Sequence, residues 1–204
     1  MAPRAHGAPQ AVALASISLR GAKSDLRERE ALLSVLHKVR LKPMLRDCQV
    51  IMIIECCMGI AASHISRYVE GEPNVTVMFE GAGGKEGVPK SNESTEIMKS
   101  EFEALLEQNL FRFAPDLVTY GDTSSQRERD RFFAQLANLR YEALKRANPY
   151  DDQRYKITAK SGSTPDDLLV SVMMCPYWKR RFWSSPNPLY EPAKERIRAR
   201  FGYE

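Results

Sequence analysis

The apolar run at residues 48–54, CQVIMII, constrains the fold of this chain more than any other segment. Its apolar residues are nearly continuous rather than alternating, which is typical of a central β-strand covered on both faces. Such strands belong to α/β proteins, in which helices pack on a sheet. The run ends at Glu55, and a helix is predicted over 59–69.

Strands and helices alternate along the rest of the chain. Further strands are predicted over 12–19, 74–79, 117–120 and 154–158, and further helices over 25–40, 94–108, 126–146 and from 164 onward. Pro176 is expected to kink or end the last helix, because proline lacks the N–H that a helix interior needs. The alternation predicts a single α/β domain whose sheet has helices on both faces.

Composition and length narrow the class of protein. With 43% hydrophobic and 27% charged residues, 204 residues are enough for one globular domain with a real core. No apolar run reaches the length of a membrane span, and residues 1–10 lack the apolar core of a signal peptide. We therefore expect a soluble, intracellular protein with no membrane partner.

The charge is uneven along the chain. The net charge is +4, but the first 178 residues hold 23 basic and 23 acidic side chains, so the surplus lies in 179–204. This balance argues against a polybasic protein and allows a local surface for phosphate contact. The segment 194–200, KERIRAR, fits a nuclear-targeting or DNA-contacting helix, and a solvated basic helix is the simpler interpretation.

Cysteine and histidine give no clear site. The four cysteines show no C-x-x-C spacing, and we expect them to be reduced and buried; they are Cys48, Cys56, Cys57 and Cys175. The three histidines are too scattered for a zinc site. A nucleophile pair from Cys56 or Cys57 with His64 is open, although packing explains these residues better. The sequence also lacks a P-loop and a G-x-S-x-G elbow, which argues against ATP hydrolysis.

Carboxylates at the ends of elements are the best candidates for chemistry. Glu55 directly follows the apolar strand, at the edge where open α/β sheets bind ligands. Asp166 and Asp167 follow Thr164 and Pro165 at a predicted helix start. Glu55 with one of these aspartates would form a hard-oxygen site suited to Mg²⁺ or Mn²⁺. Capping of the following helix is the simpler explanation for Glu55, and an ordinary helix start explains the two aspartates.

Four segments in order resemble a known family. They are IIECCMGIAASHISRYV, the glycine-rich EGAGGKEGVPKSN, FFAQLANL and ITAKSGSTPDDLLVSVMMCPYW. Together they resemble the C-terminal nuclease domain of the herpesvirus-type terminase large subunit, a viral DNA-packaging motor, over about residues 11–180. Within these segments, the matching positions are Glu55, Lys90, Gln135 with Leu136 and Leu139, and Asp166-Asp167-Leu168.

The resemblance implies a fold, an activity and a set of residues. It implies a ribonuclease H-like mixed sheet and cleavage of concatemeric double-stranded DNA with two Mg²⁺ or Mn²⁺ ions. Glu55 would bridge the metals, Asp167 would be the last aspartate ligand, and Asp166 would lie beside it. Lys90, and with weaker support Lys85 and Lys160, would contact the DNA backbone; a solvated loop explains lysines there equally well.

One departure from the family pattern weakens the nuclease interpretation. The family's first aspartate lies on a first strand, and a second strand precedes the segment that residues 12–19 resemble, but no aspartate precedes Asp25 here. We therefore expect a sheet without its first two strands. The alternative is a noncatalytic ribonuclease H-like fragment that binds DNA or other terminase subunits.

The resemblance also predicts partners, location and domain limits. The partners would be double-stranded DNA, other terminase subunits and the capsid portal, with no small-molecule substrate, in the host cell nucleus. The expected organisation is a flexible leader at 1–10, a ribonuclease H-like domain at 11–183, and a proline-rich linker with a basic C-terminal segment at 184–204.

Overall fold

The computed structural model describes seven stretches of the chain, 11–16, 25–54, 62–79, 92–120, 124–145, 155–160 and 167–202. It is a mixed α/β structure, as expected, and its described strands form three two-stranded sheets. The chain divides into two compact units. Unit 1 comprises 1–16 and 92–176, and unit 2 comprises 17–91 and 177–204. The domain limits expected from the sequence stay predictions.

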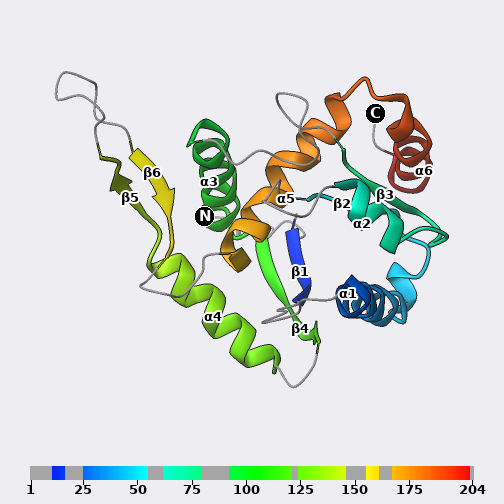
Figure 1. Cartoon of the computed structure of the whole chain (residues 1–204), viewed down its shortest axis with the longest axis horizontal. Helices are drawn as coiled ribbons and strands as arrows, with labels where there is room; N and C mark the ends of the chain where they lie inside the picture. The colour runs from blue at the N-terminus through cyan, green and yellow to red at the C-terminus, as the bar shows by residue number, and fades with distance from the viewer. Residues whose placement is uncertain are drawn as a thin grey trace, which may run out of the picture. The chain divides into compact units, whose positions relative to one another are not determined.

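Unit 1 contains a parallel strand pair, in which β1 (Ala11–Ser16) lies beside β4 (Phe111–Thr119) (Figure 1). The register shifts between the pairs Ala13–Phe113 and Ala15–Val118. Pro115 lies in the shifted part of β4, where the missing proline N–H breaks the ladder and favours an irregularity of this kind.

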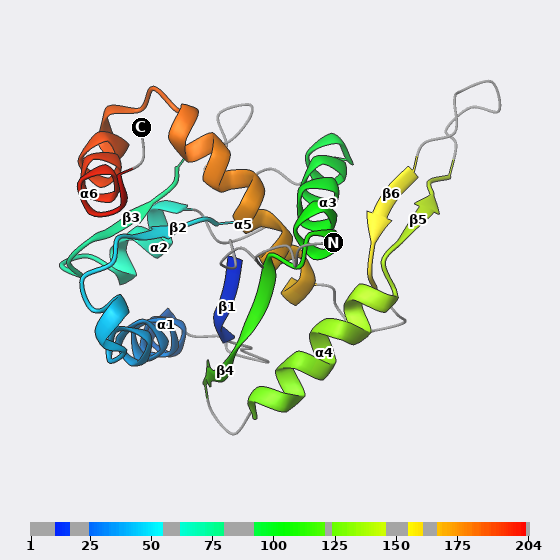
Figure 2. The same ribbon diagram turned by 180° about the vertical axis from the view of Figure 1, so that it is seen from behind.

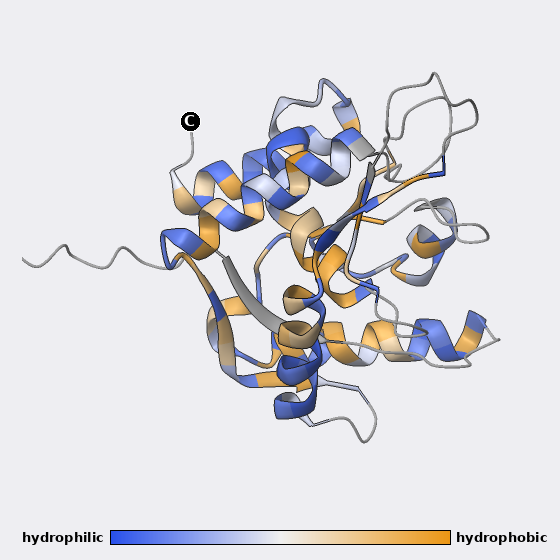
Figure 3. Ribbon diagram, turned by 90° about the vertical axis from the view of Figure 1, so that its left-hand side faces the viewer, coloured by the Kyte–Doolittle hydropathy of each residue, from blue (hydrophilic) through white to orange (hydrophobic). Residues whose placement is uncertain are grey.

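Two helices of unit 1 contribute phenylalanines to its core. α3 (Asn92–Glu107) contributes Phe102, and α4 (Ser125–Ala137) contributes Phe132, which is fully buried. The ring of Phe132 lies 5.1 Å from that of Phe113 and 6.0 Å from that of Phe102. Figure 3 shows helices with both hydrophobic and hydrophilic bands, the pattern of helices that bury one face.

The prediction of one helix over 126–146 is wrong. α4 ends at Ala137, and β5 (Arg140–Ala143) then pairs antiparallel with β6 (Tyr155–Thr158), as Figure 2 also shows. Asn138 leaves the helical conformation, and its side-chain amide donates to the Ala134 carbonyl at 2.7 Å. Ala143 follows Phe132, Leu136 and Leu139 at the spacing of one helix face, which favoured a longer helix. The β5 residues, Ala143 among them, are all exposed, so this spacing does not mark a buried face.

Unit 2 contains a second parallel strand pair. The apolar run at 48–54 forms β2 (Val50–Met52), which pairs with β3 (Val75–Val77). The three β2 residues are half-buried, so the expected burial of this strand on both faces is not seen in the part that is described. Val69 and Val77 form a buried cluster against which Leu32 and Leu33 pack.

Helix α1 (Asp25–Arg40) precedes β2 in the sequence, and α2 (Ala62–Tyr68) lies between β2 and β3. Glu72 connects α1 to the start of β3, since one carboxylate oxygen lies 3.0 Å from Arg40 Nη1 and the other 2.9 Å from His37 Nε2. The Arg40 side chain also donates to the Pro73 carbonyl. These contacts bridge residues more than thirty positions apart and hold the C-terminal turn of α1 in unit 2.

The helix after the second aspartate continues past Pro176. α5 (Asp167–Ser184) contains Pro176 in its interior, so the proline does not end the helix. The 3-10 helix η3 (Pro188–Tyr190) and α6 (Glu191–Phe201) follow where a linker-like turn was expected. Tyr190 is 1% exposed and its hydroxyl accepts a hydrogen bond from the Phe79 N–H at 3.0 Å. This segment is therefore packed against β3 within unit 2.

No described helix has both the length and the apolar character that crossing a bilayer requires. The expectation of buried cysteines fails at Cys175, which is exposed on α5, while Cys48 is half-buried. Cys175 Sγ lies 3.4 Å from the Ser171 carbonyl, a contact within the same helix. Cys56 and Cys57 lie outside the described residues.

Candidate functional site

The structure describes two of the six residues proposed from the sequence. Asp167 and Lys160 are described, and both belong to unit 1. Glu55, Asp166, Lys85 and Lys90 lie outside the described residues. The geometry of the candidate site is therefore built from the start of α5 and the end of β6.

Asp167 is the first residue of α5, and its side chain is exposed. The same first turn is anchored from another helix, because the Leu169 N–H donates to Gln135 Oε1 at 2.8 Å. Gln135 is 2% exposed and Leu169 is fully buried. The first N–H groups of a helix have no partner within the helix, so a buried one needs an acceptor of this kind.

The position of Gln135 depends on α4. This helix begins at the N-cap Ser124, whose hydroxyl accepts from the Arg127 N–H at 3.2 Å. Arg129 connects α4 to β4 by donating to the carbonyls of Ala114 at 2.5 Å and Pro115 at 2.8 Å. Gln135 thereby joins α5 to a helix that is itself attached to the strand pair of unit 1.

Two of the segments that carry the family resemblance meet at this contact. Gln135 belongs to the Q-L-A-N-L segment, and Asp167 and Leu169 belong to the segment that follows the lysine of ITAKSG. Both segments were singled out in the sequence for their resemblance to the family. The sequence did not predict that the Gln135 side chain accepts a hydrogen bond from the helix that begins at Asp167. A glutamine two positions before the end of α4 gives no local signal for a contact thirty-four residues away.

Lys160 lies just after β6, where the strand becomes exposed. Thr158 and Ala159 are buried, and the Lys160 side chain is exposed. The Lys160 N–H donates to Thr158 Oγ1 at 3.2 Å, which holds the backbone as it leaves the strand. This placement gives the amino group access to solvent and to any anionic ligand.

The described part of the site supplies one hard oxygen ligand. Asp167 offers a carboxylate, the group that Mg²⁺ and Mn²⁺ prefer. Within the described ranges no group of three histidine, cysteine, aspartate or glutamate side chains could hold a metal ion. The other two proposed ligands, Glu55 and Asp166, belong to undescribed ranges. A carboxylate in the first turn of α5 also stabilises the helix without any metal.

Of the candidate thiol–histidine pair, the structure describes only His64. His64 Nε2 lies 2.7 Å from the Tyr68 hydroxyl and 3.5 Å from Asp25 Oδ2. Burial raises the pKa of Tyr68, and the nearby carboxylates of Asp25 and Glu28 raise it further. His64 therefore belongs to a polar contact between α2 and the start of α1.

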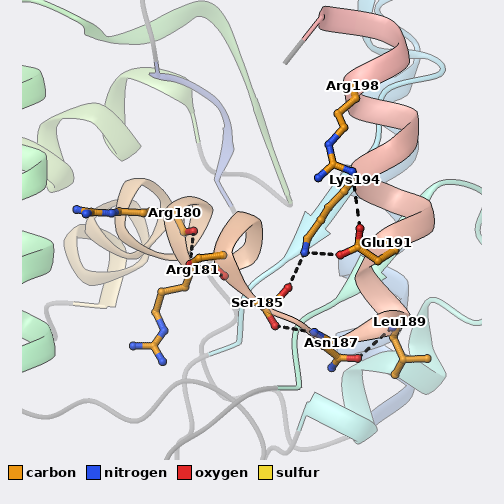
Figure 4. Close-up of polar contacts among 9 residues, drawn as sticks. Arg180, Arg181, Ser185, Asn187, Leu189, Glu191, Lys194 and Arg198 are labelled. Carbon is orange, nitrogen blue, oxygen red and sulfur yellow. Dashed lines mark hydrogen bonds and ion pairs between the residues drawn. The ribbon is translucent and has the colours of Figure 1, made fainter. Parts of the chain in front are cut away.

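A second group of polar side chains, absent from the sequence-based site, surrounds α6 (Figure 4). Lys194 is 2% exposed, and its ammonium group donates to the Ser185 carbonyl at 2.6 Å and to Glu191 Oε1 at 2.7 Å. The hydrogen bond from Lys194 is the main cause of the lowered pKa of Glu191. The sequence interpretation took Lys194 as part of a solvated basic face, and its burial is the correction.

Comparisons with protein-family models, with curated proteins and with solved structures find no match for this chain.

Proposed function

We propose that the chain is a metal-dependent endonuclease of the viral DNA-packaging terminase type, with concatemeric duplex DNA as its substrate. The observation that supports this proposal best is the hydrogen bond between Gln135 and Leu169. It brings together two of the four segments on which the terminase resemblance rests, and it fixes the first turn of the helix that begins with an exposed aspartate.

In this proposal Glu55, Asp166 and Asp167 hold two Mg²⁺ or Mn²⁺ ions. Two metal ions held there would activate the attacking water and stabilise the leaving oxygen of the phosphodiester. Asp167 would contribute a carboxylate, and the first turn of its helix is held by the buried hydrogen bond from the Leu169 N–H to Gln135. Lys160, with Lys85 and Lys90, binds the DNA backbone, which gives affinity without reading the base sequence.

We further propose a fold, partners and a cellular location for the enzyme. A ribonuclease H-like sheet would carry the three acids, and the enzyme would act in the host cell nucleus with other terminase subunits and the capsid portal. The first aspartate of the family pattern has no counterpart among the residues before Asp25.

A plasmid-nicking assay tests the proposed activity. The chain is incubated with supercoiled plasmid in Mn²⁺ or in EDTA, and the conversion to nicked circles is followed with time. Once strands that carry the family's first aspartate are supplied, we expect nicking in Mn²⁺ and none in EDTA, and we expect its loss in Glu55→Ala and in Asp167→Ala. Asp130→Ala is the matched control, because Asp130 is an exposed aspartate on α4 outside the site. Nicking that survives both site substitutions would show that the assigned carboxylates are the wrong ones.

A second candidate function is DNA binding without cleavage. The observation that favours it is the exposed run Lys179, Arg180 and Arg181 in the part of α5 that belongs to unit 2. The Arg181 guanidinium lies 4.8 Å from the centre of the Trp178 ring, and Trp178 is itself 3% exposed, so the exposed cations alone would contact DNA phosphates. Filter binding of duplex DNA without metal, together with no nicking by the folded chain, would favour this function over the nuclease.

A further inference from the structure

Three large apolar side chains of unit 2 are exposed where η1 (Pro43–Leu45) meets the end of α6. Leu41 is 77% exposed, Met44 is 83% exposed and Phe201 is 57% exposed. We call them the Leu41–Met44–Phe201 patch. Exposed apolar side chains gathered in one region are typical of an interaction surface.

One hydrogen bond brings the two segments of this patch together. Arg200 Nη2 lies 3.3 Å from the Met44 carbonyl, although the two residues are 156 positions apart. A second contact nearby has the same effect, since Arg196 Nε donates to Gln49 Oε1 at 2.8 Å. α6 is therefore attached along one side to the residues that run from η1 into β2.

Phe201 continues the buried stripe of α6 beyond the core. Ala193, Ile197 and Phe201 are spaced four residues apart and share one face of the helix. Ala193 is 1% exposed and Ile197 is half-buried, whereas more than half of Phe201 is exposed. The apolar face of α6 thus runs out from the interior of unit 2 onto its surface.

The surroundings of the patch are basic. Residues 38–46, KVRLKPMLR, contain four basic side chains and no acidic one. Lys38 and Arg46 are exposed, and Arg200 on α6 is exposed as well. Three acidic side chains partly offset this charge: Asp47 follows Arg46, Glu195 lies between Lys194 and Arg196 on α6, and Glu72 pairs with Arg40.

We propose that the Leu41–Met44–Phe201 patch binds an acidic, apolar-faced helical segment of a partner protein. Arginine, methionine and aromatic residues together are the composition of the core of protein–protein interfaces. The basic border complements an acidic partner and would steer it to the surface. Double-stranded DNA fits less well, because contact with phosphates would leave the three apolar side chains without an apolar surface to cover.

A fluorescein-labelled synthetic helix tests this inference by fluorescence anisotropy. The probe is an 18-residue peptide with leucines along one face and glutamates on the other, and a peptide of the same composition in scrambled order is its control. We expect the ordered peptide to bind the full chain, and its affinity to fall by about fivefold or more in Met44→Ser and in Phe201→Ser. Arg46→Glu should also weaken binding, and binding should weaken as salt is raised.

Matched variants separate the patch from general effects. Leu189→Ser is the apolar control, because Leu189 is 67% exposed on η3 of the same unit. Arg67→Glu is the charge control, because Arg67 is exposed on α2. Both controls should bind the peptide as the unchanged chain does, and circular dichroism of every variant confirms that it is folded.

Five results would overturn the inference. They are no binding of the ordered peptide, equal binding of the scrambled peptide, an equal loss in Leu189→Ser, binding of a 20-base-pair duplex that Met44→Ser and Phe201→Ser abolish, and binding of anionic lipid vesicles that the same two substitutions abolish. The inference does not rest on the metal site, so its outcome and that of the nicking assay are independent.

Discussion

Replacing Gln135 with leucine is predicted to loosen the start of α5. The substitution keeps the size of the side chain and removes the oxygen that accepts the Leu169 N–H at 2.8 Å. Leu169 is fully buried, so its N–H would stay buried without an acceptor. An unsatisfied buried donor costs about 1–3 kcal/mol. We therefore expect the free energy of unfolding to fall by about that amount.

Three measurements check this prediction. Urea unfolding followed by circular dichroism should show a lower midpoint in Gln135→Leu, with the slope of the transition unchanged. Hydrogen exchange of a peptide from the first turns of α5 should be faster in the variant, because the loss of stability is local. A thermal midpoint should fall by about 2–4 °C for each kcal/mol in a chain of this size.

Gln126→Leu is the control for the same substitution on the same helix. Gln126 is exposed, and its amide donates to Asp130 Oδ1 at 2.7 Å within one turn of α4. Exposed substitutions of this kind change stability by about 0.5 kcal/mol or less. If the two variants have equal midpoints and equal exchange at the start of α5, then the Gln135 contact does not hold the helix in place.

Four other substitutions test the packing and the charges of the two units. Phe132→Ala should lower the free energy of unfolding by about 3–5 kcal/mol, because Phe132 is fully buried. Phe133→Ala should lower it by less than half as much, because Phe133 is 54% exposed. Equal losses measured by urea unfolding would contradict the described core. Lys194→Met should destabilise unit 2 by about 1–3 kcal/mol, since the Ser185 carbonyl loses a charged donor, and should raise the pKa of Glu191 toward its usual range. Because the pKa of Glu191 is lowered in the folded chain, it contributes stability above the ordinary carboxyl pKa, and this stability is lost as the pH falls. The Lys194→Met variant should therefore lose less stability in acid. An unchanged titration of the Glu191 carboxyl by NMR would refute this. The raised pKa of Tyr68 contributes stability that is complete below the pKa of tyrosine in the unfolded chain, about 10, and is lost as the pH rises through the pKa in the folded chain. Tyr68→Phe should therefore reduce unfolding at alkaline pH. Identical unfolding curves of the two chains at alkaline pH would refute this.

Local signals in the sequence predict several elements well. The helix predicted over 25–40 corresponds to α1, and the strand predicted over 154–158 corresponds to β6. The apolar run at 48–54 does contain a strand, β2, paired in parallel with β3. In each case the signal lies within the element itself, so no distant contact is needed to recognise it.

The errors arise where tertiary contacts decide. Ala143 continued the helical period of α4, yet pairing with Tyr155 on β6 places it in a strand. Pro176 was expected to kink or end α5, but the helix continues to Ser184. Lys194 was expected on a solvated face, but the Ser185 carbonyl and Glu191 make its burial possible.

The candidate site was predicted residue by residue but not as a geometry. The sequence proposed Asp167 at a helix start, which the structure bears out. It gave no sign that Gln135 would hold the first turn of α5 by accepting from the Leu169 N–H, because that contact depends on how α4 and α5 pack. The roles of Asp167 as a metal ligand and of Lys160 as a DNA contact stay predictions.

Binding of Mn²⁺, measured by electron paramagnetic resonance, tests most directly whether Glu55 and Asp167 share a metal site. Free Mn²⁺ gives a six-line signal that shrinks as the ion is bound, so a titration of the chain gives the affinity and the stoichiometry. We expect saturable binding that Glu55→Gln and Asp167→Asn each weaken by about tenfold or more, while Asp130→Asn leaves it unchanged. Equal binding by the unchanged chain and both site variants, or no saturable binding at all, would contradict the account.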